Sequence, residues 1–202
     1  YFYLESSNSA MLTEHINTGQ SQLVEIPLAS LLLLTQSVDY VKDKLKHRPE
    51  IRMFGKVCHQ NRAIGFFSDD SIGYRYSRKL MRSQPLGGPL KDLLDQTNGI
   101  FGTKFNGILV NYYANGTETI GDHSDDEIGL HNGMVVGLSY GAERKFRIKD
   151  KKTKKKVMDV PTRHGSYLVM TGDFQNEFTH GIPCEKTITE GRYSFTFRCH
   201  SE

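Results

Sequence analysis

Two stretches in the first half of the chain place apolar residues at helical spacing. Between residues 27 and 47 an apolar side chain recurs every three or four positions, and Pro49 closes the pattern. Residues 89–96 repeat this spacing, and Gly99 follows as a predicted stop signal. We therefore predict two helices that pack on a core. Their apolar positions are Leu31, Leu34, Val38, Val41 and Leu45 in the first, and Leu90, Leu93 and Leu94 in the second.

The remainder of the first half lacks such a pattern. Residues 1–22 are polar and weakly patterned, which predicts an irregular or partly ordered lead-in. Residues 51–77 are rich in glycine, aromatic residues and arginine, which predicts loops and short strands with the composition of a binding surface.

From Asn106 onward the apolar residues occur in short runs separated by turn signals such as Asn132-Gly133. So many short strands in one block predict a sandwich or barrel, and hence a mixed α/β chain that is mainly β. The predicted strands are residues 108–112, 134–140, 145–149, 157–160, 166–170 and 193–199.

The last predicted strand, RYSFTFRC, alternates strictly. One face carries Tyr193, Phe195, Phe197 and Cys199 and should pack against the helices; the other carries Arg192, Ser194, Thr196 and Arg198. If the polar face points into the barrel, its arginines require an anion, because an unpaired buried charge is costly. A dicarboxylate fits, since guanidinium groups bind carboxylates bidentately. The alternative is an edge strand with its arginines in water.

Length and charge limit the remaining possibilities. A chain of 202 residues suits one domain with a sizeable core. The net charge of +3 is only mildly basic, but residues 144–156 (RKFRIKDKKTKKK) concentrate cations that would attract phosphate. The alternative is a solvated hairpin tip.

The three cysteines, Cys58, Cys184 and Cys199, are odd in number and have no CxxC spacing. They favour an intracellular, reducing compartment without a disulfide framework or a thiolate zinc site. The longest apolar run, residues 31–34, is far too short to span a membrane.

The candidate chemistry lies in GDHSDDE, residues 121–127. His123 and Asp125 are two apart, so on an extended segment their side chains point the same way and can hold one metal. With a second histidine from elsewhere, the open-sided set is typical of non-haem Fe(II) that activates dioxygen. The alternative is a surface loop with a capping aspartate.

The order HxD, a distant histidine and a closing RxSxTFR resembles the AlkB family of Fe(II)- and 2-oxoglutarate-dependent dioxygenases. The resemblance implies that His180, in FTHGIP, is the third ligand, and that Fe(II), 2-oxoglutarate and O2 are required. It also implies one structural domain with a double-stranded β-helix (jelly-roll) core at residues 105–202. An N-terminal extension and supporting helix at 1–50, and a nucleotide-recognition lid with the second helix at 51–104, would precede it.

The same resemblance assigns a 2-oxoglutarate site. Arg192 would hold the remote carboxylate and Arg198 the carboxylate next to the keto group. The other residues that match this site are Asn111, Tyr113, Thr196 and Ser194, the last standing where the family usually has asparagine.

Residues 53–77 are similar to the eukaryotic AlkB homologues that repair duplex DNA. Met53, Phe54 and Gly55 match a finger that enters the base stack, with positive charge nearby from Arg52, Lys56 and Arg62. The alternative for Phe54 is a core position at the end of a strand. Substrate contacts are implied for Arg62, for Tyr74, Tyr76 and Ser77 in the wall of the base pocket, and for Asp126 and Glu127 beside the base.

One segment departs from the family. Where duplex-binding members carry a basic cluster after the distal histidine, this chain has Pro183-Cys184-Glu185-Lys186. The departure weakens the expected grip on the opposite DNA strand and favours RNA or single strands.

The other histidines have simpler interpretations. We predict His15, His47 and His59 at the surface, His131 in a turn, His200 in a tail, and His164 in a structural hydrogen bond.

The resemblance implies an oxidative demethylase that removes N-methyl groups from nucleic-acid bases, releasing formaldehyde and succinate, in DNA repair. The expected partner is methylated nucleic acid, DNA or RNA, bound by a monomer without a membrane, in the nucleus of a eukaryote. The alternatives are an RNA demethylase, an oxygenase acting on proteins or small molecules, and a non-catalytic nucleic-acid-binding module.

Overall fold

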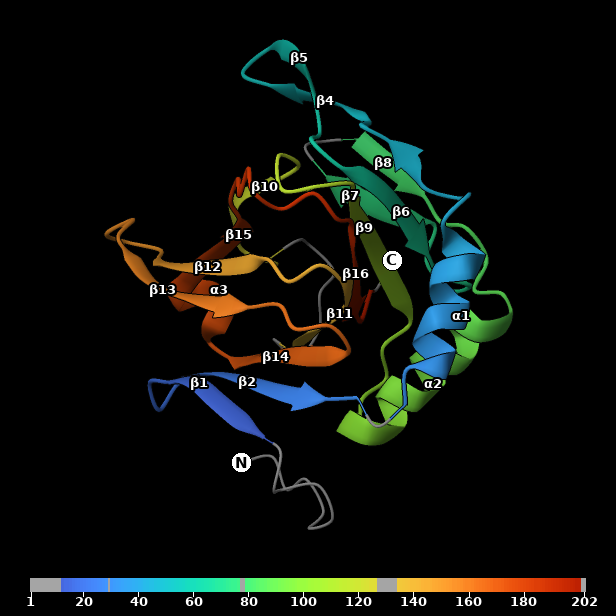
Figure 1. Ribbon diagram of the computed structural model, residues 1–202, viewed down its shortest axis with the longest axis horizontal. Coiled ribbons are helices and arrows are strands. Elements are labelled where there is room, and N and C mark those ends of the chain that lie inside the picture. The colour runs from blue at the N-terminus through green and yellow to red at the C-terminus, as the bar shows by residue number, and fades with distance from the viewer. Residues whose placement is uncertain (1–11, 29, 77–78, 127–133, 201–202) are drawn as a thin grey trace.

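The computed structural model describes residues 12–28, 30–76, 79–126 and 134–200. Two antiparallel sheets face each other in a jelly-roll, and two helices lie against the outside of the larger sheet (Figure 1). The larger sheet has the strand order β1 (Thr13–Asn17), β2 (Ser21–Pro27), β14 (Ser166–Gly172), β11 (Val135–Gly141), β16 (Arg192–Arg198), β9 (Gly107–Tyr113), β6 (Ala63–Phe67) and β3 (Lys46–His47). The smaller has the order β10 (Ile120–His123), β15 (Phe178–Ile182), β12 (Lys145–Asp150) and β13 (Lys156–Pro161).

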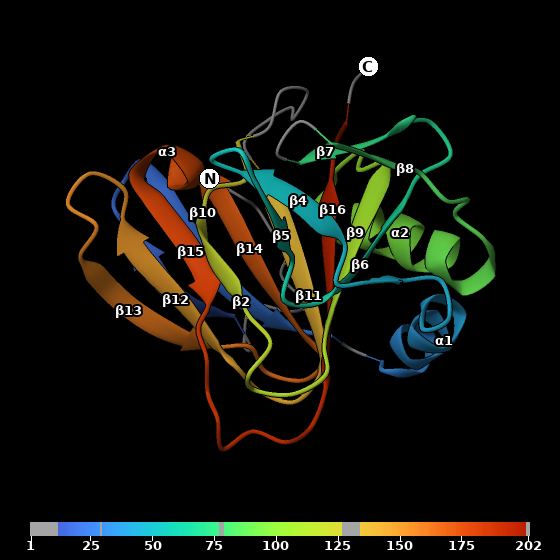
Figure 2. The ribbon, with the colours of Figure 1, turned by 90° about the horizontal axis from the view of Figure 1, so that it is seen from above.

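Two hairpins stand at one end of the molecule, at the top of Figure 1, and lie toward the viewer in Figure 2, which is seen from above. They are β4 (Glu50–Met53) with β5 (Lys56–His59), and β7 (Gly73–Tyr76) with β8 (Lys79–Arg82). Between them in sequence runs β6, which is fully buried and pairs with β9. The loop-rich region predicted for residues 51–77 therefore also supplies a strand of the main sheet.

Strand β16 shows how the apolar alternation organises the core. It lies between β11 and β9, with Phe195 opposite Leu138 and Phe197 opposite Val136. Phe195 and Phe197 are fully buried in the cluster formed with the two helices, whereas the polar face points between the sheets. The prediction that this strand separates an apolar face from a cationic one is confirmed, and the edge-strand alternative is wrong.

The predicted helices exist, but their bounds differ. Helix α1 (Leu32–Val41) is shorter than predicted, because the following residues turn and add β3 to the edge of the main sheet. Helix α2 (Gly88–Phe101) continues through Gly99, so the predicted stop signal is wrong. The helix ends at Gly102, whose φ of 62° allows its N–H to bond the carbonyl of Asn98. Glycine is favoured where φ is positive, and Gly99 occupies no such position.

The predicted lead-in is partly ordered rather than irregular, because residues 13–17 and 21–22 belong to strands. Strand β2 pairs with β14 over its whole length, and β1 pairs with β2. A charged residue that is buried in the structure interrupts the apolar pattern of β2, so the sequence did not indicate this strand. Glu25 on β2 is only 4% exposed, and its carboxylate is paired with His15 at 2.8 Å and Arg163 at 2.6 Å. His15 is consequently half-buried in an ion pair rather than at the surface.

The six strands predicted after residue 106 are confirmed to within two residues at each end. Strands β10 and β15, which were not predicted, carry His123 and His180, and Asp125 of the HxD motif lies two residues beyond β10. A third, short helix, α3 (Phe174–Glu177), precedes β15. Among the described residues, no helix is long and apolar enough to cross a membrane.

Candidate metal centre and adjoining cavity

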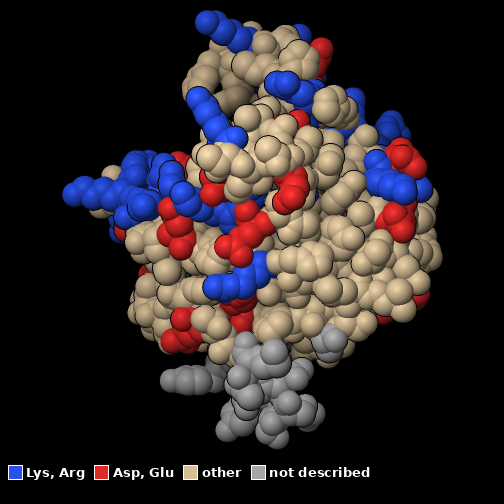
Figure 3. Space-filling view, viewed as in Figure 1, with Lys and Arg blue, Asp and Glu red and all other residues tan. Residues whose placement is uncertain are grey.

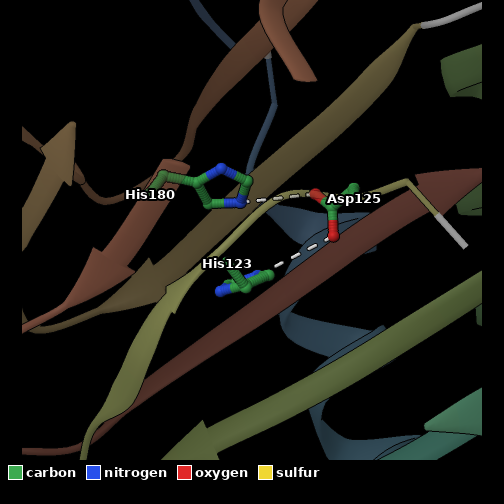
Figure 4. A group of neighbouring side chains, drawn as sticks. All are labelled: His123, Asp125 and His180. Carbon is green, nitrogen blue, oxygen red and sulfur yellow. Dashed lines mark ion pairs between the residues drawn. The ribbon is translucent and has the colours of Figure 1, made fainter. Parts of the chain in front are cut away.

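Three side chains from adjacent strands meet between the sheets (Figure 4). Strands β10 and β15 pair antiparallel with His123 opposite His180, and Asp125 follows β10 directly. The two imidazole centroids are 4.4 Å apart. Asp125 Oδ2 lies 3.3 Å from His180 Nε2, and Asp125 Oδ1 lies 3.8 Å from His123 Nε2. One ligand atom from each residue lies within 4.8 Å of the others, which is close enough for a single metal ion.

The tautomer of His123 is fixed by the backbone. Its Nδ1–H donates to the carbonyl of Gly121 at 2.9 Å, which leaves the lone pair of Nε2 facing Asp125. Burial and, next, the neighbouring His180 lower the pKa of His123 to about 4. The imidazole is therefore neutral at physiological pH, the form that binds a metal.

Asp125 is 5% exposed and carries the negative charge of the group. Burial opposes ionisation, but the attraction of Arg198, followed by the hydrogen bond and charge of His180, outweighs it and lowers the pKa of Asp125. Arg198 Nη2 donates to Asp125 Oδ1 at 2.9 Å, and the backbone N–H of Asp125 donates to Gln175 Oε1 at 2.8 Å. The carboxylate is thus held as an anion in a fixed orientation.

His180 is placed by stacking. Its ring lies 4.8 Å from that of Phe146 at an interplanar angle of 20°, and its Nε2 faces Asp125. Two imidazole nitrogens and one carboxylate, with the cavity on their open side, suit a non-haem Fe(II) ion. The residues present therefore fit the metal that the motif predicts.

The cavity continues from this centre along the inner face of β16. The two histidines, Asp125 and every predicted 2-oxoglutarate contact line it, and Arg62 and Tyr74 close one side. Its polar lining residues are Arg62, Tyr74, Asn111, Tyr113, His123, Asp125, Ser139, His180, Arg192, Ser194, Thr196 and Arg198.

Arg192 is 5% exposed at the end of the cavity away from the metal centre. Its Nη2 donates to Ser139 Oγ at 2.9 Å, and its guanidinium lies 5.6 Å from the ring centroid of Tyr113. No carboxylate among the described residues pairs with it, and its buried Nε has no hydrogen-bond partner there. Burial, with a further contribution from Arg144, lowers the pKa of Arg192 to about 10. The group stays charged at neutral pH and is suited to an anionic ligand.

Arg62 lies elsewhere than predicted. It is 6% exposed and donates to Asn111 Oδ1 at 2.7 Å and to Gln60 Oε1 at 2.8 Å. It therefore does not add surface charge beside the finger. Its buried guanidinium instead orients Asn111 within the cavity wall.

Arg144 is a buried residue that the sequence reasoning missed. It was assigned to the basic run, but it is 2% exposed. It donates to the carbonyls of Asn115, Gly116, Glu118 and Pro183 and pairs with Glu185 at 3.2 Å. Arg144 therefore ties together the loops after β9 and β15. The signal was available: it shares the inward alternation of β12 with Phe146 and Ile148.

Phe54 and Gly55 form the two-residue turn of the β4–β5 hairpin, and Met53 is the last residue of β4. Phe54 and Gly55 have φ values of 50° and 78°, as a tight hairpin turn of this type requires. Phe54 is 99% exposed and Met53 is 46% exposed. The alternative that Phe54 belongs to the core is wrong.

The structure describes some of the predicted base-pocket residues but not all of them. Tyr74 is buried in the cavity wall beside Phe66, with ring centroids 5.9 Å apart. Asp126 is outside the cavity lining, and its carboxylate pairs with Lys151 at 3.0 Å. The Tyr76 side chain, Ser77 and Glu127 lie outside the described residues.

The remaining histidines show one further error. The backbone N–H of Gly141 donates to His164 Nδ1 at 2.9 Å, which confirms the structural hydrogen bond, and His47 and His59 are exposed as predicted. His200 is not a tail residue, because its ring packs 5.0 Å from that of Phe66 and burial lowers its pKa to about 4. His131 lies outside the described residues.

The exposed part of the basic run is the tip of the β12–β13 hairpin, at the left of Figure 3, where lysines gather. Lys152, Lys154 and Lys155 are exposed there, whereas Arg147 is held by both oxygens of Asp159. The interpretation as a solvated hairpin tip is therefore correct for these three lysines. It does not extend to Arg144 and Arg147, which are held in ion pairs.

Comparisons with known proteins agree with this geometry. The family model of the 2OG-Fe(II) oxygenase superfamily matches residues 25–198. The chain is 30% identical over 173 residues to the human DNA oxidative demethylase ALKBH2, covering 82% of this chain and 65% of that protein. It is 31% identical to the Mus musculus ALKBH2, covering 82% of this chain and 71% of that protein. It is 33% identical over 137 residues to the human alpha-ketoglutarate-dependent dioxygenase alkB homolog 3, covering 63% of this chain and 48% of that protein.

The solved structure of OsALKBH1 superposes with a TM-score of 0.55 at 18% identity, covering 91% of this chain and 99% of that one, and it supports the fold. The chain belongs to the 2OG-Fe(II) oxygenase superfamily, whose members use Fe(II), 2-oxoglutarate and O2, and within it to the AlkB family.

Proposed function

We propose that this protein is an oxidative demethylase that removes N-methyl groups from nucleic-acid bases. The observation that carries the proposal is a single cavity that joins the centre formed by His123, Asp125 and His180 to Arg192. Arg192 is buried there and pairs with no carboxylate of the described residues. An iron site and a site for an organic anion are thereby placed in a single enclosure. With Fe(II), 2-oxoglutarate and O2 bound, the chemistry supplied is hydroxylation of the N-methyl carbon, giving succinate, carbon dioxide and a hydroxymethyl product that loses formaldehyde.

The two arginines of β16 would hold the ends of 2-oxoglutarate. Arg192 would bind the remote carboxylate by a charge-assisted pair, because it lies away from the metal centre and has no carboxylate of its own. Arg198, bonded to the metal-ligand candidate Asp125, would face the carboxylate next to the keto group. Asn111, Tyr113, Ser194 and Thr196 would complete the walls.

The finger supports a duplex substrate. A fully exposed phenylalanine on a tight hairpin is an apolar wedge that can fill the space left by a flipped base. The named activity of the ALKBH2 relatives, DNA oxidative demethylation, points to DNA. We therefore propose methylated DNA as the substrate, in DNA repair, with RNA as the second candidate.

The flipped base would enter beside Tyr74, which forms part of the cavity wall next to the metal centre. Tyr76, Ser77 and Glu127 are proposed as further contacts. Asp126 would approach the exocyclic amine, and its ion pair with Lys151 orients that carboxylate.

Residues 183–186 lack the basic cluster of the duplex-binding relatives and contain Glu185 instead. Glu185 turns inward to pair with the buried Arg144, so it does not repel a phosphate as a free surface anion would. We propose that the lysines of the β12–β13 tip supply the contact with the second strand instead.

We further propose that the protein acts as a monomer in a reducing compartment, which in a eukaryote would be the nucleus. The three unpaired cysteines support the compartment.

The test is formaldehyde release from methylated single- and double-stranded DNA and RNA oligonucleotides with Fe(II), 2-oxoglutarate and O2. We expect release from DNA, and none when Fe(II) or 2-oxoglutarate is omitted. Consumption of 2-oxoglutarate without formaldehyde from any oligonucleotide would favour a protein or small-molecule substrate. No consumption under any condition would favour a non-catalytic binding module.

A further inference from the structure

A second groove lies on the far side of Tyr74 from the metal centre. Its walls are the segment from β3 into β4 on one side and the β7–β8 hairpin on the other, beneath the finger. Arg62, Tyr74 and Leu109 line both this groove and the cavity. A chain lying in the groove would therefore reach the wall of the cavity that holds the metal centre.

The groove is cationic at its rim. Lys46 and Arg48 stand on one wall, Lys79 and Arg82 on the other, and the carboxylate of Glu50 is the only one among the lining residues. Lys79 lies 3.8 Å from that carboxylate, which partly neutralises it. Lys46, Arg48 and Arg82 are exposed, and no carboxylate in the described parts of the chain pairs with them. Such unmatched charges along a groove favour a polyanion.

The floor of the groove is apolar, in contrast to its rim. Ile51, Ile64 and Leu109 are each at most 6% exposed there, and Tyr74 adds an aromatic ring. A single nucleic-acid strand presents phosphates and unpaired bases at the same time, so it matches a cationic rim over an apolar floor. A duplex hides its bases and would meet only the rim.

We propose that, on a single-stranded substrate, this groove binds the segment that adjoins the nucleotide held in the cavity. The inference rests on the proposed function, since it takes the substrate to be a nucleic acid. Lys46, Arg48 and Arg82 contact the phosphates, and the apolar floor receives a neighbouring base. Buried Arg62, which bonds only neutral side chains, lies at the junction of the groove and the cavity.

The test measures binding of a fluorescent, unmethylated twelve-nucleotide single strand as a function of salt, without Fe(II) or 2-oxoglutarate. The double variant Lys46→Gln/Arg82→Gln should flatten the slope of log K against log salt by about 1.4, because each phosphate contact on a single strand contributes about 0.7. Affinity near 0.1 M salt should fall about tenfold or more. Arg48→Asn, which suits the φ of 41° at this position, should flatten the slope by about 0.7.

The matched control is Lys91→Gln/Lys104→Gln on and just after α2, which removes the same charge from an exposed surface that has no part in the proposed contacts. It should leave the single-strand slope unchanged. An equal loss in both double variants would show a general electrostatic field and overturn the groove. Competition by inorganic phosphate or a mononucleotide as strong as that by the strand would also overturn it, in favour of a small-anion site.

This experiment separates the two proposals. Weakened binding in the groove variants, with no formaldehyde from any methylated strand, would retain the groove and reject the demethylase. Formaldehyde release by the wild type, with unchanged binding in the groove variants, would do the reverse.

Discussion

The interior cavity and the surface beside the two hairpins differ in how their charged side chains are stabilised. In the cavity, Asp125 and Arg198 are both at most 5% exposed and are paired at 2.9 Å. Along the groove beside the hairpins, Arg48, Arg82 and Lys46 are exposed and unmatched by the carboxylates of the described residues. Buried ions require fixed partners, whereas exposed ions are stabilised by water and remain available to bind a large ligand. The cavity is therefore organised before a small ligand arrives, and the hairpins present charge and an aromatic side chain to a polymer.

Two arginines within the cavity also differ in how their charges are paired. Among the described residues, Arg198 pairs with the carboxylate of Asp125, while Arg192 contacts a serine hydroxyl and an aromatic face and no carboxylate. The first arginine contributes to the stability of the ligand-free protein, and the second carries a cost that an anion relieves. Stability and ligand affinity should consequently separate when the two are mutated.

The largest effect is expected at the metal centre. Asp125→Asn should reduce formaldehyde release to less than about a thousandth, because the side chain loses its charge both as a ligand and as the partner of Arg198. His123→Ala and His180→Ala should also abolish turnover. The control is Asp122→Asn on the preceding strand β10, whose exposed carboxylate pairs with Lys149. If the Asp125 variant retains full turnover, the cavity is not the catalytic centre.

The second prediction separates the two arginines. Arg198→Met should lower the free energy of unfolding by about 3 to 5 kcal/mol, because it leaves Asp125 buried without its cationic partner. Arg192→Met should leave that free energy unchanged or raise it, yet remove the gain in melting temperature produced by an unreactive 2-oxoglutarate analogue. Denaturant and thermal unfolding with and without the analogue measure both. Equal destabilisation by the two variants would contradict the comparison.

The third prediction concerns acid. His123 has a pKa of about 4 in the folded protein, below its ordinary value of 6.5, so between these limits the unfolded chain binds the extra proton. Its stabilising contribution is complete above pH 6.5 and falls by up to about 1.4 kcal/mol per pH unit toward pH 4. Asp125, whose pKa is lowered, adds a loss below about pH 4. Urea unfolding of the metal-free protein at pH 7, 5.5 and 4.5 should show this decline, and a flat profile would exclude a buried neutral His123.

The smallest effect on stability is expected at the finger. Phe54→Ala should lower activity on methylated duplexes about tenfold, by analogy with the cost of losing an aromatic contact with a base. Single-strand activity and the melting temperature should remain nearly unchanged, because Phe54 is 99% exposed and packs on nothing in the core. Met53→Ala serves as the milder comparison on the same turn. Equal loss on single and double strands would remove the finger as an argument for a duplex substrate.

The sequence by itself determined the features that depend on local periodicity. The alternation of RYSFTFRC predicted both the packing of Phe195 and Phe197 and the inward arginines, because side chains alternate across any strand. The spacing of His123 and Asp125 predicted a shared direction for the same reason. His180 and the contacts of 2-oxoglutarate came from family resemblance, and the sequence offered no local rule for them.

The tertiary structure decided everything that depends on a distant partner. Glu25 and Arg144 appear as surface charges in the sequence, and their burial became possible only because the fold places His15, Arg163 and Glu185 beside them. The pairing of β10 with β15, which sets His123 opposite His180, links segments far apart in the chain. Charge, unlike an apolar pattern, carries no local sign of whether it will be paired, because the compensating group can lie anywhere in the sequence.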